Sequence, residues 1–344
     1  VASTDEPLLY SRALIQFNNR KATNWHLALY DSLGRLQQSF VPTDFGTSPL
    51  WSNRIDGNFI TTVLTRTNDF ESAQMDPQVS IESLLKMPQE ARRTYHSRKV
   101  KFPLAEWKPI ESQETFYQRL GESTGIILMG HNARSWICTG VFITSNFFLT
   151  NWHCGGLPGI PNGMYWDRSI YLNSIIDLSW DGSLKIREFR IVKVEAKSEN
   201  LDFALLKIAP MGTGGFPRPV ALSTATVAPN TRIVLIHHPE GLKKQVTFTP
   251  LCTVLDRAYR GTDLNPLEFS HTCDTEGGSS GAPIFNQEGF LVGIHHRGWQ
   301  KEDGVCDEKN KAVHLSAILQ SIKPALRREI IRGSLTAPDD LVKR

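Results

Sequence analysis

The interpretation of the second half of this chain begins with the stretch Asp274-Thr275-Glu276-Gly277-Gly278-Ser279-Ser280-Gly281-Ala282-Pro283. This stretch places a serine between glycines, and the strand-like pair Ile284-Phe285 follows it. Glycine adopts positive φ angles and lets the backbone come close to a substrate. The N–H groups of Gly278 and Ser280 could therefore converge on a developing oxyanion, with the Ser280 hydroxyl as nucleophile. The competing interpretation is a solvated glycine–serine turn.

Two upstream segments offer partners for that serine. In the first, two apolar strand-like runs are separated by a Thr-Ser-Asn turn and end in His153, which adjoins Cys154. In the second, Asp202 opens the otherwise apolar run 203–208. A carboxylate in such a run is expected to be partly buried, and burial is tolerable only if it has a partner. The order histidine, aspartate, serine is one of the known chain orders of a catalytic triad.

These segments resemble the trypsin/chymotrypsin-like serine peptidases, and more closely the bacterial branch that includes the glutamyl endopeptidases. The family motif Thr-Ala-Ala-His-Cys is matched by Thr150-Asn151-Trp152-His153-Cys154, and the motif Gly-Asp-Ser-Gly-Gly-Pro by Gly278-Ser279-Ser280-Gly281-Ala282-Pro283. Cys138 lies 16 residues before Cys154, the spacing of the family's histidine-loop disulfide. The strand that lines the primary specificity pocket resembles Gly293-Ile294-His295-His296-Arg297-Gly298. The resemblance covers residues 121–332, and its motifs are specific because they occur together and in order.

The resemblance implies a role for each residue of the triad. His153 would take the proton of Ser280 and deliver it to the leaving amine, while Asp202 would hold the imidazole in the useful tautomer. Gly278 and Ser280 would supply the oxyanion hole. Many animal members have an aspartate before the nucleophile, where this chain has Ser279. Activation through an ion pair of that aspartate is therefore not expected. The function class opposed to an endopeptidase is a non-catalytic binding protein on the same fold.

Substrate preference has two opposing indications. Asp274 stands where trypsin-like enzymes bind Lys or Arg, whereas Thr275 and His295 stand where glutamyl endopeptidases bind an acidic P1 side chain. Gly298 is expected on the same substrate-binding strand. We predict a weak preference for Lys or Arg, because a carboxylate is more surely charged at neutral pH than an imidazole. His296 and Arg297 are interpreted as an exposed strand edge, and Glu276 as solvated at the pocket rim.

The five cysteines indicate an oxidising compartment. The resemblance pairs Cys138 with Cys154. For the others, Cys252–Cys273 is the first choice and Cys273–Cys306 the rival. We expect a secreted or periplasmic protein of bacterial type. Because the chain begins at Val1 rather than methionine, it reads as a mature chain whose export signal has been removed.

Composition narrows the partners. A net charge of +3 over 344 residues gives no strong attraction to nucleic acid or membrane, and no apolar stretch is long enough to span a bilayer. The histidine pairs His237-His238 and His295-His296 have no partners at recognised ligand spacing, so neither metal nor cofactor is expected. We expect a monomer that acts on protein or peptide substrates.

Many short strand-like runs predict an all-β fold: two six-stranded antiparallel barrels of the chymotrypsin type over residues 121–344. Leu315, Ile318, Leu319, Ile322, Leu326 and Ile330 recur at helical spacing and predict a C-terminal helix that Pro324 kinks or interrupts. Residues 1–95 are expected to form a small β-sandwich-like accessory domain, with a propeptide as the alternative. Residues 96–120 are expected to be a linker, and the basic residues near it, from Arg92 to Lys101, suit a processing site.

Overall fold

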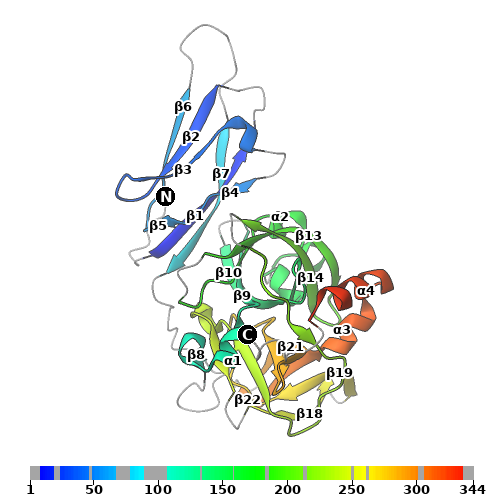
Figure 1. Cartoon of the computed structure of the whole chain (residues 1–344). Coiled ribbons are helices and arrows are strands. Elements are labelled where there is room, and N and C mark those ends of the chain that lie inside the picture. Colours follow the sequence, from blue (N-terminus) through cyan, green and yellow to red (C-terminus); the bar gives the residue numbers. More distant parts are fainter. Residues whose placement is uncertain are drawn as a thin grey trace. The chain divides into compact units, whose positions relative to one another are not determined.

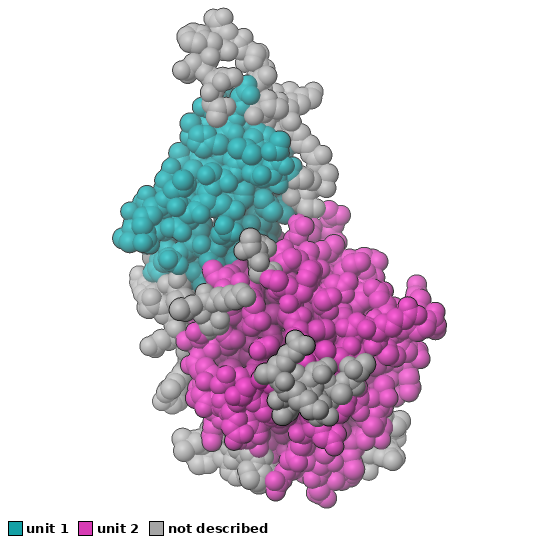
Figure 2. All heavy atoms as spheres, viewed as in Figure 1, with its two compact units in different colours: residues 1–91, 130–135 teal, residues 92–129, 136–344 magenta. Residues whose placement is uncertain are grey.

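The structure is a computed structural model and describes residues 8–18, 24–45, 49–66, 78–88, 107–131, 134–157, 159–182, 186–211, 215–248, 252–260, 263–300 and 306–335. Its regular structure is mainly β-strands, with four short α-helices in the described part (Figure 1). The chain divides into two compact units: unit 1 consists of residues 1–91 and 130–135, and unit 2 of residues 92–129 and 136–344 (Figure 2). The basic stretch 92–101 lies outside the described residues.

Unit 1 contains two antiparallel sheets. One is built on β1 (Leu8–Phe17), which pairs with β4 (Leu50–Trp51), β5 (Ile55–Asp56) and β7 (Val79–Pro88); the other has the order β3 (Leu36–Phe40), β2 (Trp25–Tyr30), β6 (Thr61–Arg66). Side chains of both sheets form one apolar cluster, which comprises Ala13, Ile15, Phe17, Trp25, Leu27, Leu29, Phe40 and Ile55. Two sheets that share a core in this way have the pattern of a β-sandwich.

The first half of unit 2 is a closed six-stranded barrel. Its order is β10 (Arg134–Phe142), β11 (Phe147–Thr150), β14 (Phe203–Met211), β13 (Glu188–Ser198), β12 (Ile175–Asp177) and β9 (Thr124–His131). The interior is filled by large apolar side chains that these strands turn inward, among them Phe142, Phe148 and Phe189. A barrel of this size is packed by side chains rather than hollow.

The second half of unit 2 is a curled nine-stranded sheet. Its path is β18 (Val254–Arg260), β19 (Asp263–His271), β22 (Cys306–His314), β21 (Phe290–Gln300), β20 (Pro283–Asn286), β16 (Ile233–His237), β17 (Gln245–Thr247) and β8 (Lys108–Pro109), with β15 (Ala221–Leu222) beside β21. An isolated bridge between Arg232 and Thr253 joins the start of β16 to the start of β18, so the sheet curls back on itself without continuous pairing. The predicted all-β, chymotrypsin-like fold is thus confirmed, with a curled sheet of more strands in place of the second closed barrel.

The stretch expected to be a linker, residues 96–120, includes elements of unit 2. From Trp107 onward it contributes β8, whose Pro109 is the register partner of Gln245, and most of α1 (Thr115–Gly121). Ile110 and Leu120 are buried in the core that joins the two halves of unit 2. The sequence did not predict this role because apolar residues are sparse in this polar stretch. Each of them packs against residues that are far away in the chain.

The C-terminal segment forms two helices, α3 (Leu315–Ser321) and α4 (Pro324–Gly333), in place of one. Pro324 begins α4, a position where its missing N–H costs nothing and its fixed φ suits a helix. Buried residues of α3 pack in the same core as Val141 of the barrel and Phe285 of the curled sheet. None of the described helices is long and apolar enough to cross a membrane.

Candidate active site

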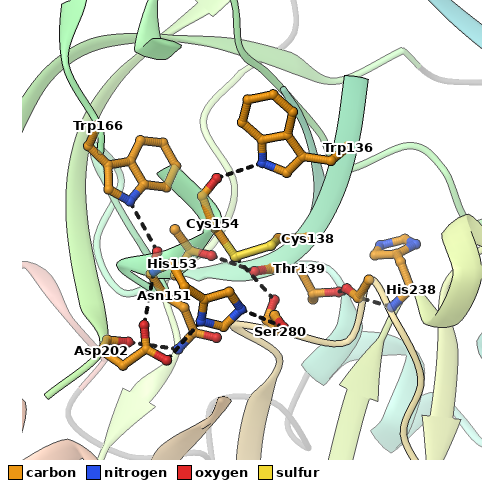
Figure 3. Close-up of a disulfide and its surroundings, with 12 residues drawn as sticks. Trp136, Cys138, Thr139, Asn151, His153, Cys154, Trp166, Asp202, His238 and Ser280 are labelled. Carbon is orange, nitrogen blue, oxygen red and sulfur yellow. Dashed lines mark hydrogen bonds and ion pairs between the residues drawn. A yellow bond between two sulfur atoms is a disulfide. The ribbon is translucent and has the colours of Figure 1, made fainter. Parts of the chain in front are cut away.

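Three side chains from distant parts of unit 2 lie within hydrogen-bonding distance of one another (Figure 3). His153 follows β11 in a single 3₁₀ turn, Asp202 ends the turn before β14, and Ser280 lies in the loop between β19 and β20. His153 Nε2 is 2.8 Å from Ser280 Oγ, and His153 Nδ1 is 2.8 Å from Asp202 Oδ2. The barrel therefore supplies the imidazole and the acid, and the curled sheet supplies the alcohol.

Asp202 is held firmly for its contact with His153. Its side chain is almost completely buried, and Oδ1 accepts a hydrogen bond of 2.9 Å from the backbone N–H of His153. Its backbone has a φ of +46°, a region that costs energy for a residue other than glycine. Burial alone raises the pKa of Asp202, but hydrogen bonds from His153 and His296 outweigh it and keep the pKa well below its usual range. The carboxylate is therefore ionised at neutral pH.

Two disulfides anchor the loops that carry these groups. Cys138 of β10 is joined to Cys154, the residue after His153, and Trp136 donates a hydrogen bond of 2.8 Å to the Cys154 carbonyl (Figure 3). Cys252 is joined to Cys273, directly before the loop 274–282, which carries Ser280 and is called the nucleophile loop after its predicted role. Each closes a loop of about 20 residues and stabilises the fold by about 3 kcal/mol on a chain-entropy estimate. The rival pairing of Cys273 with Cys306 is therefore wrong; the Cys306 side chain lies outside the described part of the structure.

The nucleophile loop makes two turns that require glycine. Gly278 and Gly281 have φ angles of +94° and +82°. A Cβ atom at Gly281 would lie 2.2 Å from the Thr139 carbonyl oxygen, closer than real contacts allow. Thr139 also holds the loop directly, because its N–H donates to the Ser280 carbonyl and its hydroxyl donates to the Gly278 carbonyl, at 2.8 and 2.7 Å. The oxyanion donors predicted here, the N–H groups of Gly278 and Ser280, lie in this fixed loop.

Ser279, which stands in place of the aspartate of animal relatives, has a buried histidine as its partner. Its hydroxyl lies 2.8 Å from His237 Nδ1 and accepts from the Glu276 N–H at 3.1 Å. Burial, and to a smaller extent the neighbouring His238 and His271, holds the pKa of His237 well below its ordinary value. The pair is therefore a neutral hydrogen bond inside the protein. The sequence gave no sign of this contact.

We predict that Ser279→Ala lowers the free energy of unfolding by about 1–3 kcal/mol, because it leaves the buried His237 ring nitrogen without its hydroxyl partner. Urea unfolding followed by tryptophan fluorescence measures the change. The matched control is Ser145→Ala, since Ser145 is an exposed serine in the turn before β11 and its loss should change stability by less than about 0.5 kcal/mol. Equal stability of the two variants would contradict the role of the pair.

A cavity of about 250 Å³ opens beside Ser280. Of the described residues, it is lined by His153, Thr275, Glu276, Gly277, Ser280, His295, His296, Arg297 and Gly298. Thr275, His295 and Gly298 were predicted for this pocket, whereas Asp274, also predicted, is buried and does not line it. His295 Nδ1 lies 3.1 Å from the Nε2 atom of the buried His271. Glu276 is largely buried rather than solvated.

His296 is buried beside Asp202, so its prediction as part of an exposed strand edge is wrong. Its side chain is only 5% exposed, and its Nδ1 atom lies 3.2 Å from Asp202 Oδ2. Arg297, the next residue, is exposed as expected. The signal available was the buried apolar run 290–294 directly before it, since a polar side chain that continues such a run needs a polar partner.

Comparisons with known proteins relate part of unit 2 to a known family. Residues 138–294 match the trypsin-like peptidase domain family. The chain is 25% identical to secreted RxLR effector protein 73 of Plasmopara viticola over 182 residues (50% of this chain, 44% of that one). It is 24% identical to a glutamyl endopeptidase of Staphylococcus epidermidis over 193 residues (53% and 59%). A solved protease from M. tuberculosis, in its active form, aligns with a TM-score of 0.45 and 16% identity (68% and 91%).

Residues 138–294 thus form a trypsin-like peptidase domain, and the predicted resemblance to the trypsin/chymotrypsin-like serine peptidases is confirmed. The chain spans about half the length of the curated relatives that it matches.

Proposed function

We propose that this protein is a serine endopeptidase that cleaves peptide bonds through an acyl-enzyme intermediate. The observation that carries the proposal is the continuous path of hydrogen bonds from Ser280 through His153 to the buried Asp202. A binding protein on the same fold would have no need to keep an alcohol, an imidazole and an ionised acid in this geometry. Membership of residues 138–294 in a peptidase family supports the same reaction class.

The proposed reaction follows from the atoms that face one another. Ser280 Oγ attacks the substrate carbonyl while its proton passes to His153 Nε2, and Asp202 stabilises the imidazolium that results. The negative oxygen of the tetrahedral intermediate is received by the Gly278 and Ser280 N–H groups. The intermediate collapses when His153 returns the proton to the leaving amine. Water then repeats the sequence on the acyl-enzyme and regenerates the free serine.

For the substrate, we propose an acidic P1 residue in place of the weakly expected Lys or Arg. That expectation depended on an Asp274 carboxylate that faces the pocket, and Asp274 is not among the described lining residues. The cavity is instead lined by Thr275, His295 and the exposed residue Arg297. A guanidinium forms charge-assisted hydrogen bonds with carboxylates. The Staphylococcus relative is itself a glutamyl endopeptidase, which supports this choice.

We further propose a secreted or periplasmic setting, since two buried disulfides near the active site persist in oxidising compartments. We also propose that the protein is of bacterial origin, that it is a monomer, and that it requires neither a cofactor nor a metal. Residues 1–95 would serve as an accessory domain, or alternatively as a propeptide, and residues 121–344 would form the peptidase domain. The partners would be protein or peptide substrates.

The reaction class is tested by labelling the full chain with a fluorophosphonate, which reacts with activated serines. We expect stoichiometric labelling at Ser280 in the peptide map. A folded chain that remains unlabelled would favour the binding protein instead.

The P1 preference is tested with a mixed peptide library, in which we predict cleavage after Glu or Asp. Arg297→Gln should lower kcat/KM for a Glu substrate about tenfold relative to the matched Gln substrate, because the variant loses one charge-assisted contact. Cleavage mainly after Lys or Arg would contradict the acidic preference, and so would an unchanged Glu-to-Gln ratio in the variant.

A further inference from the structure

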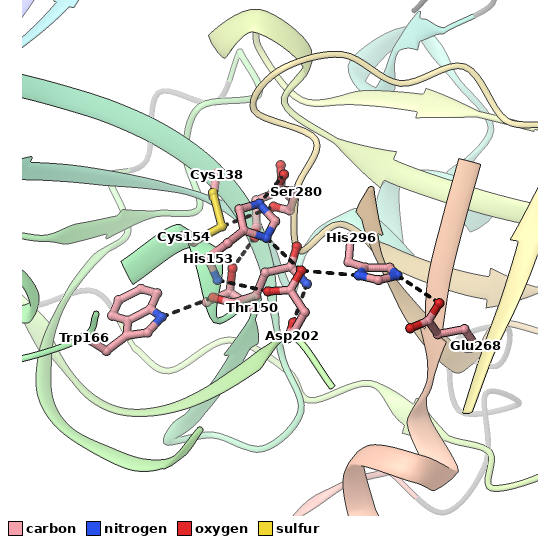
Figure 4. Close-up of polar contacts among 11 residues, drawn as sticks. Cys138, Thr150, His153, Cys154, Trp166, Asp202, Glu268, Ser280 and His296 are labelled. Atoms are coloured by element: carbon pink, nitrogen blue, oxygen red, sulfur yellow. Dashed lines mark hydrogen bonds and ion pairs between the residues drawn. A yellow bond between two sulfur atoms is a disulfide. The ribbon is translucent and has the colours of Figure 1, made fainter. Parts of the chain in front are cut away.

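A second imidazole contacts the acid of the triad on the side away from His153 (Figure 4). His296, on β21, has its Nδ1 atom 3.2 Å from Asp202 Oδ2, the same oxygen that lies 2.8 Å from His153 Nδ1. One carboxylate oxygen therefore lies between two histidine rings. The other oxygen, Oδ1, accepts the His153 N–H. The Asp202 carboxylate is thus contacted by His153 and His296, while the Asn151 side chain donates a hydrogen bond of 2.8 Å to the main-chain carbonyl of Asp202.

A second carboxylate lies behind His296. Glu268, on β19, has Oε2 3.7 Å from His296 Nε2, which is an ion-pair distance (Figure 4). Both side chains are almost fully buried, 5% exposed for His296 and 3% for Glu268. A buried charge is tolerated when an opposite charge is close. The path from Ser280 thus continues beyond Asp202 to His296 and Glu268.

His296 has reason to carry a proton. Burial by itself lowers its pKa, but its contacts with Asp202 and Glu268 outweigh burial and raise the pKa above the ordinary histidine value. The groups that face it are Asp202 from the turn before β14 and Glu268 from β19, with His153 beyond Asp202. Further ionisable side chains lie on its own strand (His295 and Arg297), on the paired strand β22 (Lys311 and His314) and on β19 (His271).

We propose that His296, held by Glu268, is a positioning residue of the peptidase reaction: it fixes the Asp202 carboxylate and sets the basicity of His153. This inference depends on the proposed function. The two carboxylates and one imidazolium leave a single negative charge in excess, which protonation of His153 cancels. In a triad with one acid and one histidine, protonation of the histidine likewise cancels a single negative charge. Glu268 therefore offsets the positive charge that His296 brings.

The test compares His296→Asn with His296→Leu in the full chain, because the asparagine amide can replace the Nδ1 hydrogen bond without its charge. We expect His296→Leu to lower kcat by about 10- to 100-fold, as misplaced catalytic groups do, with KM nearly unchanged. His296→Asn should recover most of kcat. The acid limb of its kcat/KM profile against pH should nevertheless shift upward by about one pH unit, because the cation beside Asp202 is gone while Glu268 remains.

The charge balance is tested by adding Glu268→Gln to His296→Asn. We expect this double variant to return the acid limb toward its wild-type position, a result that a merely structural role would not produce. Three outcomes would overturn the proposal: a kcat of His296→Leu close to wild type, no advantage of asparagine over leucine, or an acid limb that does not move. An inactive, unlabelled wild type would instead reject the peptidase function itself.

Discussion

Replacing Ser280 with alanine is expected to reduce peptide hydrolysis by about 10⁶-fold and to abolish fluorophosphonate labelling. The loss is this large because the alcohol forms the only covalent bond to the substrate in the proposed reaction. The fold should persist, since the loop is held by main-chain contacts that alanine retains: the Ser280 carbonyl accepts from Thr139, and the Gly281 N–H donates to His295, both at 2.8 Å. Single-turnover assays with an ester substrate measure the effect.

The matched control for this variant is again Ser145→Ala, which removes an exposed hydroxyl at the surface of the barrel and should keep full activity. Thermal unfolding of both variants separates a lost nucleophile from a lost fold. Turnover of a peptide by Ser280→Ala within about 100-fold of wild type would show that another group attacks the carbonyl, and the nucleophile assignment would then be abandoned.

Replacing Asp202 with asparagine is expected to lower kcat by about 10⁴-fold. The amide can donate its own N–H to His153 Nδ1, and this favours the tautomer that carries hydrogen on Nε2. An Nε2–H group cannot accept the proton of Ser280, although every heavy atom stays near its present position. The variant also removes the negative charge that stabilises the imidazolium, and it leaves the imidazoles of His153 and His296 without their shared anion.

The Asp202→Asn experiment requires a measurement that separates acylation from binding. Pre-steady-state kinetics with a chromogenic ester give the acylation rate, and KM is expected to change little. A loss of tenfold or less would mean that another acid orients His153. Because Glu268 is the other carboxylate near this path, Glu268→Gln would then be the variant to compare.

The three residues of the predicted triad, which lie together in the structure, could be picked out from the sequence because each lies within a local pattern. His153 and Ser280 lie in motifs of five or six residues, and Asp202 opens an apolar strand. The all-β architecture followed from many short runs of strand-forming residues. The cysteine pairs Cys138–Cys154 and Cys252–Cys273 present in the structure are the ones chosen first.

Contacts made across the fold were beyond reach from the sequence. His296 was interpreted as exposed because nothing local to β21 shows that Asp202 and Glu268 lie beside it. The partnership of His237 with Ser279 spans 42 positions and has no motif. The direction of Asp274 depends on backbone turns in a glycine-rich loop, which composition does not fix. Tertiary pairing also drew Lys108 and Pro109 into the second sheet, although their neighbourhood is polar.

Ser280 and His153 belong to different halves of unit 2, one to the curled sheet and the other to the closed barrel. The rate of the proposed reaction therefore depends on how closely these two halves pack against each other. A separation of about 1 Å would lengthen the proton's path and cost about a hundredfold in rate, while the ladder of every sheet stayed intact. A partner that separated the two halves could thus inhibit the reaction without entering the cavity beside Ser280.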